Sequence, residues 1–177
     1  MCRRVEVISE RIKDMENGNF LSEDMEYLEQ QESTGADTLF SGKQLFDLIP
    51  QRPPIVMVDA LYSAGDSEAE TGLRIGEDNM FVAEGRLREP GLIEHIAQSA
   101  AAYAGYSALS GGLKPRIGYI AEIRKFRVCR LPRTGELLRT RIRILGEAGG
   151  LSLLSAETSS GGEILASCQM KIFVRED

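Results

Sequence analysis

A stretch of small residues near the middle of the chain carries the side chains best suited to acid-base chemistry. Glu94 and Gln98 stand four residues apart in LIEHIAQSAAAYAG, so a helix places them on one face, with His95 about 100° round the axis. Burying a carboxylate on such an apolar helix costs free energy, and this cost is expected mainly where the group has a function. Glu94 is therefore a candidate for proton transfer. The alternatives are a first-turn glutamate favoured by the helix dipole, and an interface or capping role for His95.

The composition limits the other chemistry that the chain offers. His95 is the only histidine, which excludes a zinc site with two histidines and a pair of catalytic imidazoles within the chain. Cys2, Cys129 and Cys168 lie far apart and form no C-x-x-C motif, so neither a metal site nor a disulfide framework is indicated. We expect no metal and no resident cofactor, and a reducing, cytoplasmic setting.

The charge divides the chain into two parts. Of 177 residues, 42% are hydrophobic and 27% charged, which is typical of a globular domain, and no apolar run indicates a signal peptide or a membrane span. The net charge of −6 belongs to residues 1–37, which hold ten acidic and four basic side chains. We predict an acidic leader over residues 1–38, partly mobile and with a short amphipathic helix at its start, followed by a domain over residues 39–177.

The second part contains one strongly basic segment. Residues 124–143 hold eight basic side chains, opposed only by Glu136. This pattern favours an acidic or phosphate-bearing partner. Nucleic acid is not favoured, because Phe126 is the one aromatic residue available for stacking. The alternative is that arginines on solvent-facing strand positions simply keep a sheet soluble.

The elements that must position these residues follow from periodicity and turn signals. A short helix is predicted between Ser41 and Pro50, and a long one over residues 90–109, started by proline and ended by glycine. Strands are predicted over residues 55–62, 68–74, 117–128, 137–145, 151–158 and 164–174. One long helix among antiparallel strands predicts the α+β class, and the small residues of that helix would let a curved sheet wrap closely around it.

Three ordered segments carry a resemblance to a known family. LIPQRPPIVMVDAL, F-x-x-x-G-x-L-x-E-x-G-L-I-E-H-I-A-Q-S-A-A-A and GYIAEIRKFRVCRLPRTGELL resemble the hotdog-fold 3-hydroxyacyl-acyl-carrier-protein dehydratases, and the likeness spans Leu45 to about Val174. The family's helix pattern of Glu, Ala and Gln matches Glu94, Ala97 and Gln98. In its opening pattern, Gln51 replaces a histidine.

The resemblance implies a fold, a partner and a reaction. In such hotdog proteins an antiparallel sheet wraps around one long helix, and a dimer forms tunnels for an acyl chain carried on the phosphopantetheine of acyl carrier protein or on CoA. A loop histidine from one subunit and the helix glutamate from the other remove the α-proton and the β-hydroxyl, with no further cofactor. Glu94 matches the glutamate, whereas the histidine loop falls between Met80 and Arg88, where this chain reads MFVAEGRLR.

Four functions remain open at this point. The first is a divergent dehydratase, in fatty-acid-like or polyene biosynthesis, in which Glu94 works with His95, Glu84 or a held water. The second is a subunit that donates Glu94 to a site completed by a histidine of another hotdog chain, so that either a homodimer or a heterodimer is expected. The third is an acyl thioesterase in which a helix carboxylate activates water. The fourth is a non-catalytic module that binds acyl carrier protein.

The predicted site residues fall into three groups. The catalytic candidates are Glu94, His95 and Gln98. The backbone N–H groups of the helix N-terminus, around Gly91 and Leu92, are candidates for polarising the thioester carbonyl. Together with these two, the substrate-binding candidates are Gln51, Pro54, Phe81 and Ala101. Docking of the carrier protein is assigned to Arg124, Lys125, Arg127, Arg130 and Arg133.

Overall fold

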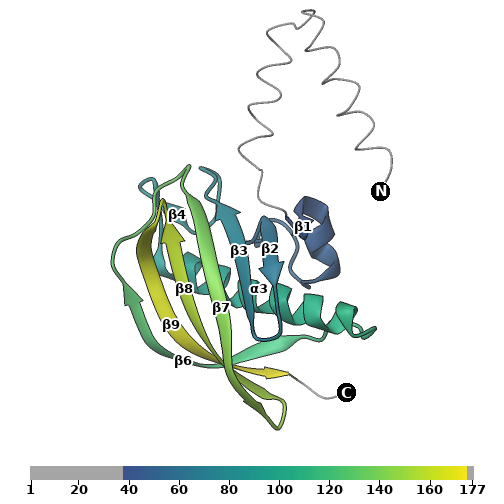
Figure 1. Cartoon of the computed structure of the whole chain (residues 1–177). Helices are drawn as coiled ribbons and strands as arrows, with labels where there is room; N and C mark the ends of the chain where they lie inside the picture. The colour runs from purple at the N-terminus through teal and green to yellow at the C-terminus, as the bar shows by residue number, and fades with distance from the viewer. Residues whose placement is uncertain (1–37, 175–177) are drawn as a thin grey trace, which may run out of the picture. The chain divides into compact units, whose positions relative to one another are not determined.

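The long helix is the centre of the domain. In the computed structural model, which describes residues 38–174, helix α3 (Glu89–Ser110) lies against the inner side of a curved antiparallel sheet (Figure 1). Pro90 stands in the first turn, where a helix has no use for the missing N–H, and Gly111 caps the far end. The predicted helix over residues 90–109 and the α+β class are confirmed.

Seven strands form the sheet in the order β1-β2-β3-β7-β8-β9-β6, and every neighbouring pair is antiparallel. Their bounds are β1 (Phe40–Ser41), β2 (Ala60–Ala64), β3 (Glu68–Arg74), β6 (Gly118–Val128), β7 (Leu137–Ala148), β8 (Leu151–Ser160) and β9 (Glu163–Val174). The four strands predicted after the helix are therefore confirmed.

Two glycine pairs close the last two hairpins. Gly149 and Gly150 join β7 to β8 with φ of 56° and 73°, and Gly161 and Gly162 join β8 to β9 with φ of 57° and 84°. Two successive residues at positive φ suit the twist of a two-residue hairpin turn, and glycine takes this conformation without steric strain. These turns fix the register in which β7, β8 and β9 pair.

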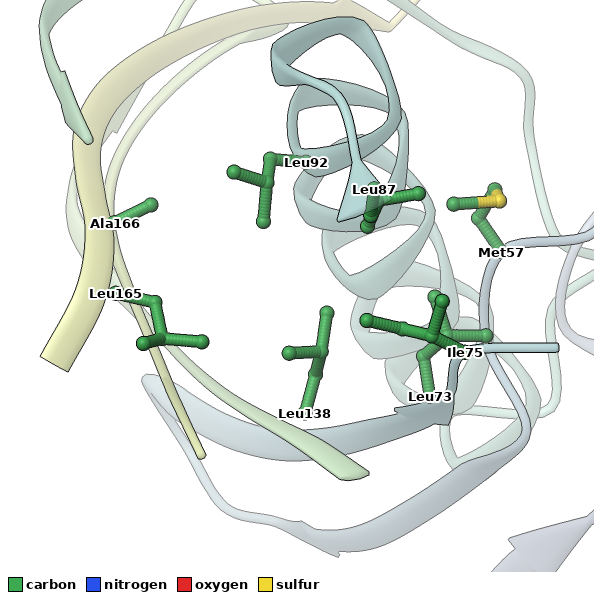
Figure 2. Close-up of a cluster of buried hydrophobic side chains, with 8 residues drawn as sticks. All are labelled: Met57, Leu73, Ile75, Leu87, Leu92, Leu138, Leu165 and Ala166. Carbon is green, nitrogen blue, oxygen red and sulfur yellow. The ribbon is translucent and has the colours of Figure 1, made fainter. Parts of the chain in front are cut away.

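Apolar side chains of the helix, of the sheet and of the segments between them form the core. Figure 2 shows one cluster, in which Leu92 extends from α3 toward Leu165 and Ala166 of β9. All its buried members are at most 3% exposed: Met57, Leu73, Ile75, Leu87, Leu92, Leu138, Leu165 and Ala166. Burial on this scale anchors the first turns of α3, where the candidate catalytic residues stand.

In its second half, α3 packs against a second apolar cluster and, at Gly105, meets the backbone of Leu48 directly. A Cβ on Gly105 would stand 2.1 Å from the carbonyl oxygen of Leu48, so only glycine fits there. Leu48 is the C-cap of a 3-10 helix, η1 (Gly42–Asp47). Ser41 is its N-cap, and the Ser41 N–H donates to Gln44 Oε1 over 3.2 Å. The short helix predicted between Ser41 and Pro50 is therefore present as a 3-10 helix, and small residues do allow close approach to α3.

Two parts of the fold differ from the prediction. The strand predicted over residues 55–62 begins only at Ala60, because the backbone groups of Ile55 and Met57 bond to side chains of α3 instead of to a neighbouring strand. A small hairpin of β4 (Val82–Ala83) and β5 (Arg86–Leu87) was not predicted. Its turn holds Glu84 and Gly85 at φ of 54° and 67°.

Other expectations concern the leader, membranes and metals. The predicted acidic leader, with the amphipathic helix expected at its start, lies outside the described residues, and the domain boundary at residue 38 stays a prediction. Within residues 38–174, no helix is both long enough and apolar enough to cross a bilayer. The same residues contain no cluster of three or more histidine, cysteine or acidic side chains that could hold a metal ion.

Candidate functional site

Glu94 and Gln98 are joined as the helical spacing predicts. Gln98 Nε2 donates to Glu94 Oε1 over 2.7 Å and to the carbonyl oxygen of Ile55 over 2.7 Å. Gln98 Oε1 accepts the backbone N–H of Met57, also over 2.7 Å. Because a backbone N–H can only donate and a carbonyl oxygen can only accept, these partners fix which end of the Gln98 amide faces which group. Gln98 therefore has no polar atom left for a ligand, and it holds Glu94 in place.

Glu94 keeps one carboxylate oxygen available. Its Oε1 accepts from Gln98, whereas Oε2 has no hydrogen-bond partner among residues 38–174. The one buried side-chain polar atom without a partner in that range is Gln51 Oε1, so Glu94 Oε2 is not sealed in the core. A half-buried carboxylate with one oxygen fixed and one open is suited to accept or donate a proton.

His95 has neither a free nitrogen nor an open side. Its side chain is 0% exposed; Nδ1 lies 2.6 Å from the carbonyl oxygen of Met57, and Nε2 lies 2.8 Å from Thr140 Oγ1. The carbonyl can only accept, so Nδ1 carries the proton and Nε2 accepts from Thr140. Burial lowers the pKa of His95 from 6.5 to about 4, and the bond to Met57 opposes this only in part. The prediction of a catalytic His95 does not hold in this geometry, because a neutral, enclosed ring cannot reach a substrate.

The N-terminal turn of α3 has no spare donors at the positions predicted. The N–H groups of Gly91 and Leu92 both donate to the carbonyl oxygen of Arg88, over 2.9 and 3.2 Å. A Cβ on Gly91 would stand 2.6 Å from Phe81 and from Leu87, which explains the glycine by packing. Gly91 and Leu92 are therefore corrected from carbonyl-polarising groups to packing residues, and Phe81 lies against the core beside them.

The other predicted binding residues are dispersed. Ala101 packs with the cluster that includes Leu45 and Leu48. Pro54 is exposed and directly precedes Ile55, whose carbonyl oxygen bonds to Gln98. Gln51 is half-buried with Oε1 unpartnered, so it retains an acceptor that a ligand donor could satisfy. Their roles in substrate binding stay predictions.

The segment that carries the family's histidine offers no substitute for it. Its residues form the β4–β5 hairpin, where Glu84 is 86% exposed and pairs with Arg88 over 2.7 Å. Glu84 thus stands at a solvent-facing turn and already has a cationic partner. Of the three catalytic candidates, Glu94 is the one with an open proton-transfer atom, and within residues 38–174 no free imidazole accompanies it.

The predicted docking residues separate into paired and unpaired cations. Arg130 forms two bonds with the Glu136 carboxylate, over 2.9 and 3.0 Å, and a third with Glu163 over 2.8 Å. Hydrogen bonding to Arg130 lowers the pKa of Glu136 to about 2. Arg124 pairs with Glu122 over 2.6 Å. Lys125, Arg127 and Arg133 form no ion pair within the described part of the chain.

Two of these unpaired cations share a groove with two arginines of β7, which sequence reasoning did not bring together. The groove has a volume of about 420 Å³ and crosses β7, β8, β9 and β6. Pairing in register aligns Arg141, Glu157, Ser167 and Arg127 in one row across these strands. The groove is lined by Lys125, Arg127, Arg141, Arg143, Ser155, Ala156, Glu157, Ser167, Cys168 and Gln169. Lys125 adopts φ of 51° at a bulge in β6, an irregularity that no sequence signal revealed.

Strand β6 leaves one side of the sheet open (Figure 1). It is the last strand in the sheet order and pairs with β9 alone among the described strands. Ile117, Tyr119 and Ile120, at its start, are 54%, 54% and 44% exposed. An unpaired strand edge with apolar side chains beside it is a surface to which another chain can add.

Comparisons with known proteins agree with this architecture. The family described as ApeP-like, ApeP dehydratase, matches residues 43–177. The dehydratase heterocomplex ApeI:P of Xenorhabdus doucetiae contains a chain that is 16% identical, with 75% of this chain and 91% of that chain covered and a TM-score of 0.71.

Two further solved structures show the same fold. The PaaI protein of the E. coli phenylacetic acid degradation operon is 12% identical over 64% of this chain and 80% of that chain, with a TM-score of 0.53. A hypothetical thioesterase of Streptococcus pneumoniae with coenzyme A is 8% identical over 66% and 88%, with a TM-score of 0.55. At these identities the likeness shows the fold alone, and that fold is the hotdog.

Proposed function

The chain belongs to the ApeP-like dehydratase family, and we propose that it supplies the Glu94 carboxylate for loss of water from a β-hydroxyacyl thioester. The observation that carries the proposal is the position of Glu94, with Oε1 fixed by Gln98 over 2.7 Å and Oε2 open. A carboxylate held in this way meets the first requirement of proton transfer, which is geometry.

The reaction needs a second group, and within residues 38–174 neither His95 nor Gln98 is free to supply it. One group removes the α-proton while the carbon–oxygen bond at the β-carbon breaks, and the other gives a proton to the departing hydroxyl, which leaves as water. Both nitrogens of His95 are already bonded within the core. The missing imidazole therefore has to come from another polypeptide.

We infer that the partner is a second, different hotdog chain that carries the loop histidine. Two copies of this chain would bring two carboxylates and no free imidazole. The open edge of β6, with Ile117, Tyr119 and Ile120 exposed beside it, offers the surface for such a partner. The ApeI:P dehydratase of Xenorhabdus doucetiae supports the idea, since that protein is itself a heterocomplex.

The test measures dehydration by mass spectrometry. The full-length chain is incubated with a β-hydroxyacyl thioester of pantetheine, alone and with a hotdog chain that has the histidine loop. We expect loss of water in the mixture, and a fall of about 10²-fold or more in rate for Glu94→Gln, in the range of general acid-base catalysis. Glu89→Gln is the matched control, because Glu89 is an exposed carboxylate in the first turn of the same helix. Equal rates for both variants would falsify the role of Glu94.

A thioesterase is the second candidate, and the same experiment separates it. One observation favours it: a single open helix carboxylate without an imidazole can still activate water. Release of the acyl group from the thioester when this chain is incubated alone, instead of loss of water in the mixture with the second hotdog chain, would identify hydrolysis. Absence of both reactions in the mixture would leave acyl-thioester binding as the function.

The basic groove of Lys125, Arg127, Arg141 and Arg143 is proposed as the docking surface for an acidic carrier protein. Arg141 and Arg143 are partly neutralised by Glu70 and Glu68, at 3.5 and 3.3 Å, whereas Lys125 and Arg127 form no ion pair within residues 38–174. This assignment replaces Arg130, whose charge is used by Glu136 and Glu163.

Charge reversal tests the docking proposal without reference to catalysis. Lys125→Glu with Arg127→Glu is expected to weaken carrier-protein binding at least about tenfold and to reduce its salt dependence. Lys114→Glu with Arg116→Glu makes the same change of charge at exposed residues outside the groove and should have little effect. A pantetheine thioester, which has no carrier protein, should be dehydrated equally by both double variants. Equal carrier binding by both would refute the docking surface and leave the solubility interpretation.

A further inference from the structure

The irregular segment before β2 is fastened to α3 by side chains of the helix. His95 Nδ1 donates to the carbonyl oxygen of Met57 over 2.6 Å, and Gln98 Oε1 accepts the N–H of the same residue over 2.7 Å. Both polar groups of Met57 are thus satisfied by residues three apart on one helix. In a strand these groups would bond to a neighbouring strand, so the segment depends on the helix side chains for its position.

We propose that His95 is a positioning residue that fixes the Glu94 carboxylate through Met57 and Gln98. The path consists of three hydrogen bonds, from His95 to Met57, from Met57 to Gln98 and from Gln98 to Glu94, of 2.6, 2.7 and 2.7 Å. The proposal rests on the proposed function, because it assigns His95 to the orientation of the same carboxylate.

The far side of the imidazole is fixed as well. Nε2 accepts from Thr140 Oγ1, so the one hydroxyl proton of Thr140 is used, and Thr158 Oγ1 must be the donor in the 2.7 Å contact with Thr140. The chain of donors therefore runs from Thr158 through Thr140 and His95 to Met57. Ser99 Oγ, which donates to the carbonyl oxygen of His95, adds a neutral contact from the helix itself.

This direction requires a neutral ring. A proton on Nε2 would point at Thr140 Oγ1 and reverse the donor chain. The groups bonded to His95 come from the 55–59 segment, α3 and β7, and none of them carries a charge. No acidic side chain is therefore bonded to the ring to stabilise a charged form.

Positioning matters because proton transfer is sensitive to small displacements. If Met57 moves, Gln98 loses the donor that sets its amide, and its Nε2 no longer holds Glu94 Oε1. Displacement of a catalytic group by about 1 Å is enough to lower a rate by about 10²-fold. The expected effect is thus on kcat, with KM little changed, because His95 does not contact the substrate.

Two conservative variants separate the two sides of the ring. The amide nitrogen of Asn in His95→Asn lies near the place of Nδ1 and retains the bond to Met57, while it gives up Thr140. The longer side chain of His95→Gln reaches the place of Nε2 and retains Thr140, while it gives up Met57. Thr140→Val is the matched control, since it removes only the hydroxyl on the far side.

The measurements are amide hydrogen exchange at Met57 and kcat of the complex on a β-hydroxyacyl pantetheine thioester. After correction for each variant's loss of global stability, the exchange rate of the Met57 amide should rise at least about tenfold in His95→Gln. The corrected rate should stay unchanged in His95→Asn and Thr140→Val. The value of kcat should fall at least about tenfold in His95→Gln, and less than about threefold in the other two.

Either measurement can overturn the proposal. If His95→Asn and His95→Gln have the same Met57 exchange, or if they have the same kcat, His95 is a core residue that does not position Glu94. If the wild-type complex does not dehydrate the thioester, the proposed function fails, and Met57 exchange alone then decides whether His95 holds the segment.

Discussion

The two halves of α3 contact the rest of the domain in opposite ways. The first half carries His95 and Gln98, which bond to backbone groups of an irregular segment, and Glu94, which accepts from Gln98. The second half carries small residues, and at Gly105 the carbonyl oxygen of Leu48 comes so close that no Cβ fits. The same helix thus holds the irregular segment by directed hydrogen bonds and approaches the Leu48 backbone where a side chain is missing, while Tyr103 adds one bond to the Asp66 carbonyl oxygen over 2.8 Å.

The difference shows where a hotdog helix can hold chemistry. Small residues allow close approach but provide no polar group, so they serve packing alone. Polar side chains near the core need hydrogen-bond partners for their donors and acceptors. Only a few atoms, such as Glu94 Oε2, therefore stay open for a reaction. Function is therefore expected at the polar half, and the strictest packing requirement at the small half.

The largest effect is expected at the small half. Gly105→Val would place a branched side chain against the Leu48 backbone, which cannot withdraw as a flexible side chain could. We expect a loss of about 3 kcal/mol or more of unfolding free energy, or failure to fold. Ala104→Val, at an exposed neighbour on the helix, should lose about 0.5 kcal/mol. Urea unfolding measures both, and similar losses would mean that the close contact is not the constraint.

The next effect is expected at the polar half. His95→Leu keeps much of the volume but leaves the Met57 carbonyl and Thr140 without their shared partner. At pH 7 the loss should be about 2–3 kcal/mol, measured by urea unfolding. A smaller loss of unfolding free energy than that of Ala104→Val would mean that the hydrogen bonds of His95 do not stabilise the polar half.

The same variant should change the pH dependence of stability. Because burial lowers the pKa of His95 to about 4 from 6.5, the unfolded chain takes up the proton first as the pH falls. The wild type should therefore be fully stabilised above pH 6.5 and lose about 3 kcal/mol more than His95→Leu as the pH falls to 4. Parallel curves of unfolding free energy between pH 7 and pH 4 would contradict the neutral, enclosed imidazole.

The smallest effect is expected in the middle of α3. Ser99 Oγ accepts from Thr71 over 2.7 Å and donates to the carbonyl oxygen of His95. Ser99→Ala should cost about 1 kcal/mol, because Thr71 keeps only a long contact of 3.5 Å with the Thr140 carbonyl. A loss as large as that of His95→Leu would place Ser99 among the residues that hold the polar half together.

Much of the fold could be predicted from local signals. The proline and glycine at the ends of α3, and the glycine pairs after β7 and β8, are effects of the residue on its own backbone, so the sequence displays them directly. The spacing of Glu94 and Gln98 likewise predicted their contact. The strand predicted from Ile55 failed because its backbone partners are side chains about 40 positions later in the chain, which no local pattern reveals.

The electrostatics of the site were the part least visible in the sequence. His95 is the single histidine and stands beside Glu94, which makes it a catalytic candidate, yet its burial depends on how Thr140 and Met57 pack around it. The basic segment is one run along the chain, whereas pairing with Glu136 and Glu163 neutralises Arg130, and strand order brings Arg141 of the same run into the groove of Arg127. Charge pattern along the chain does not fix which cations share a face.

The two glycine-pair turns also bear on the order of folding. They join β7, β8 and β9 into a meander whose contacts are local in the sequence, and such contacts are expected to form early. β6 precedes all three strands but pairs only with β9, so its contacts close a long loop and are expected to form late. β3 and β7 pair across a still longer separation, from Glu68 with Arg143 to Arg74 with Leu137, so the pairing that joins the β2–β3 hairpin to this meander is expected to form last.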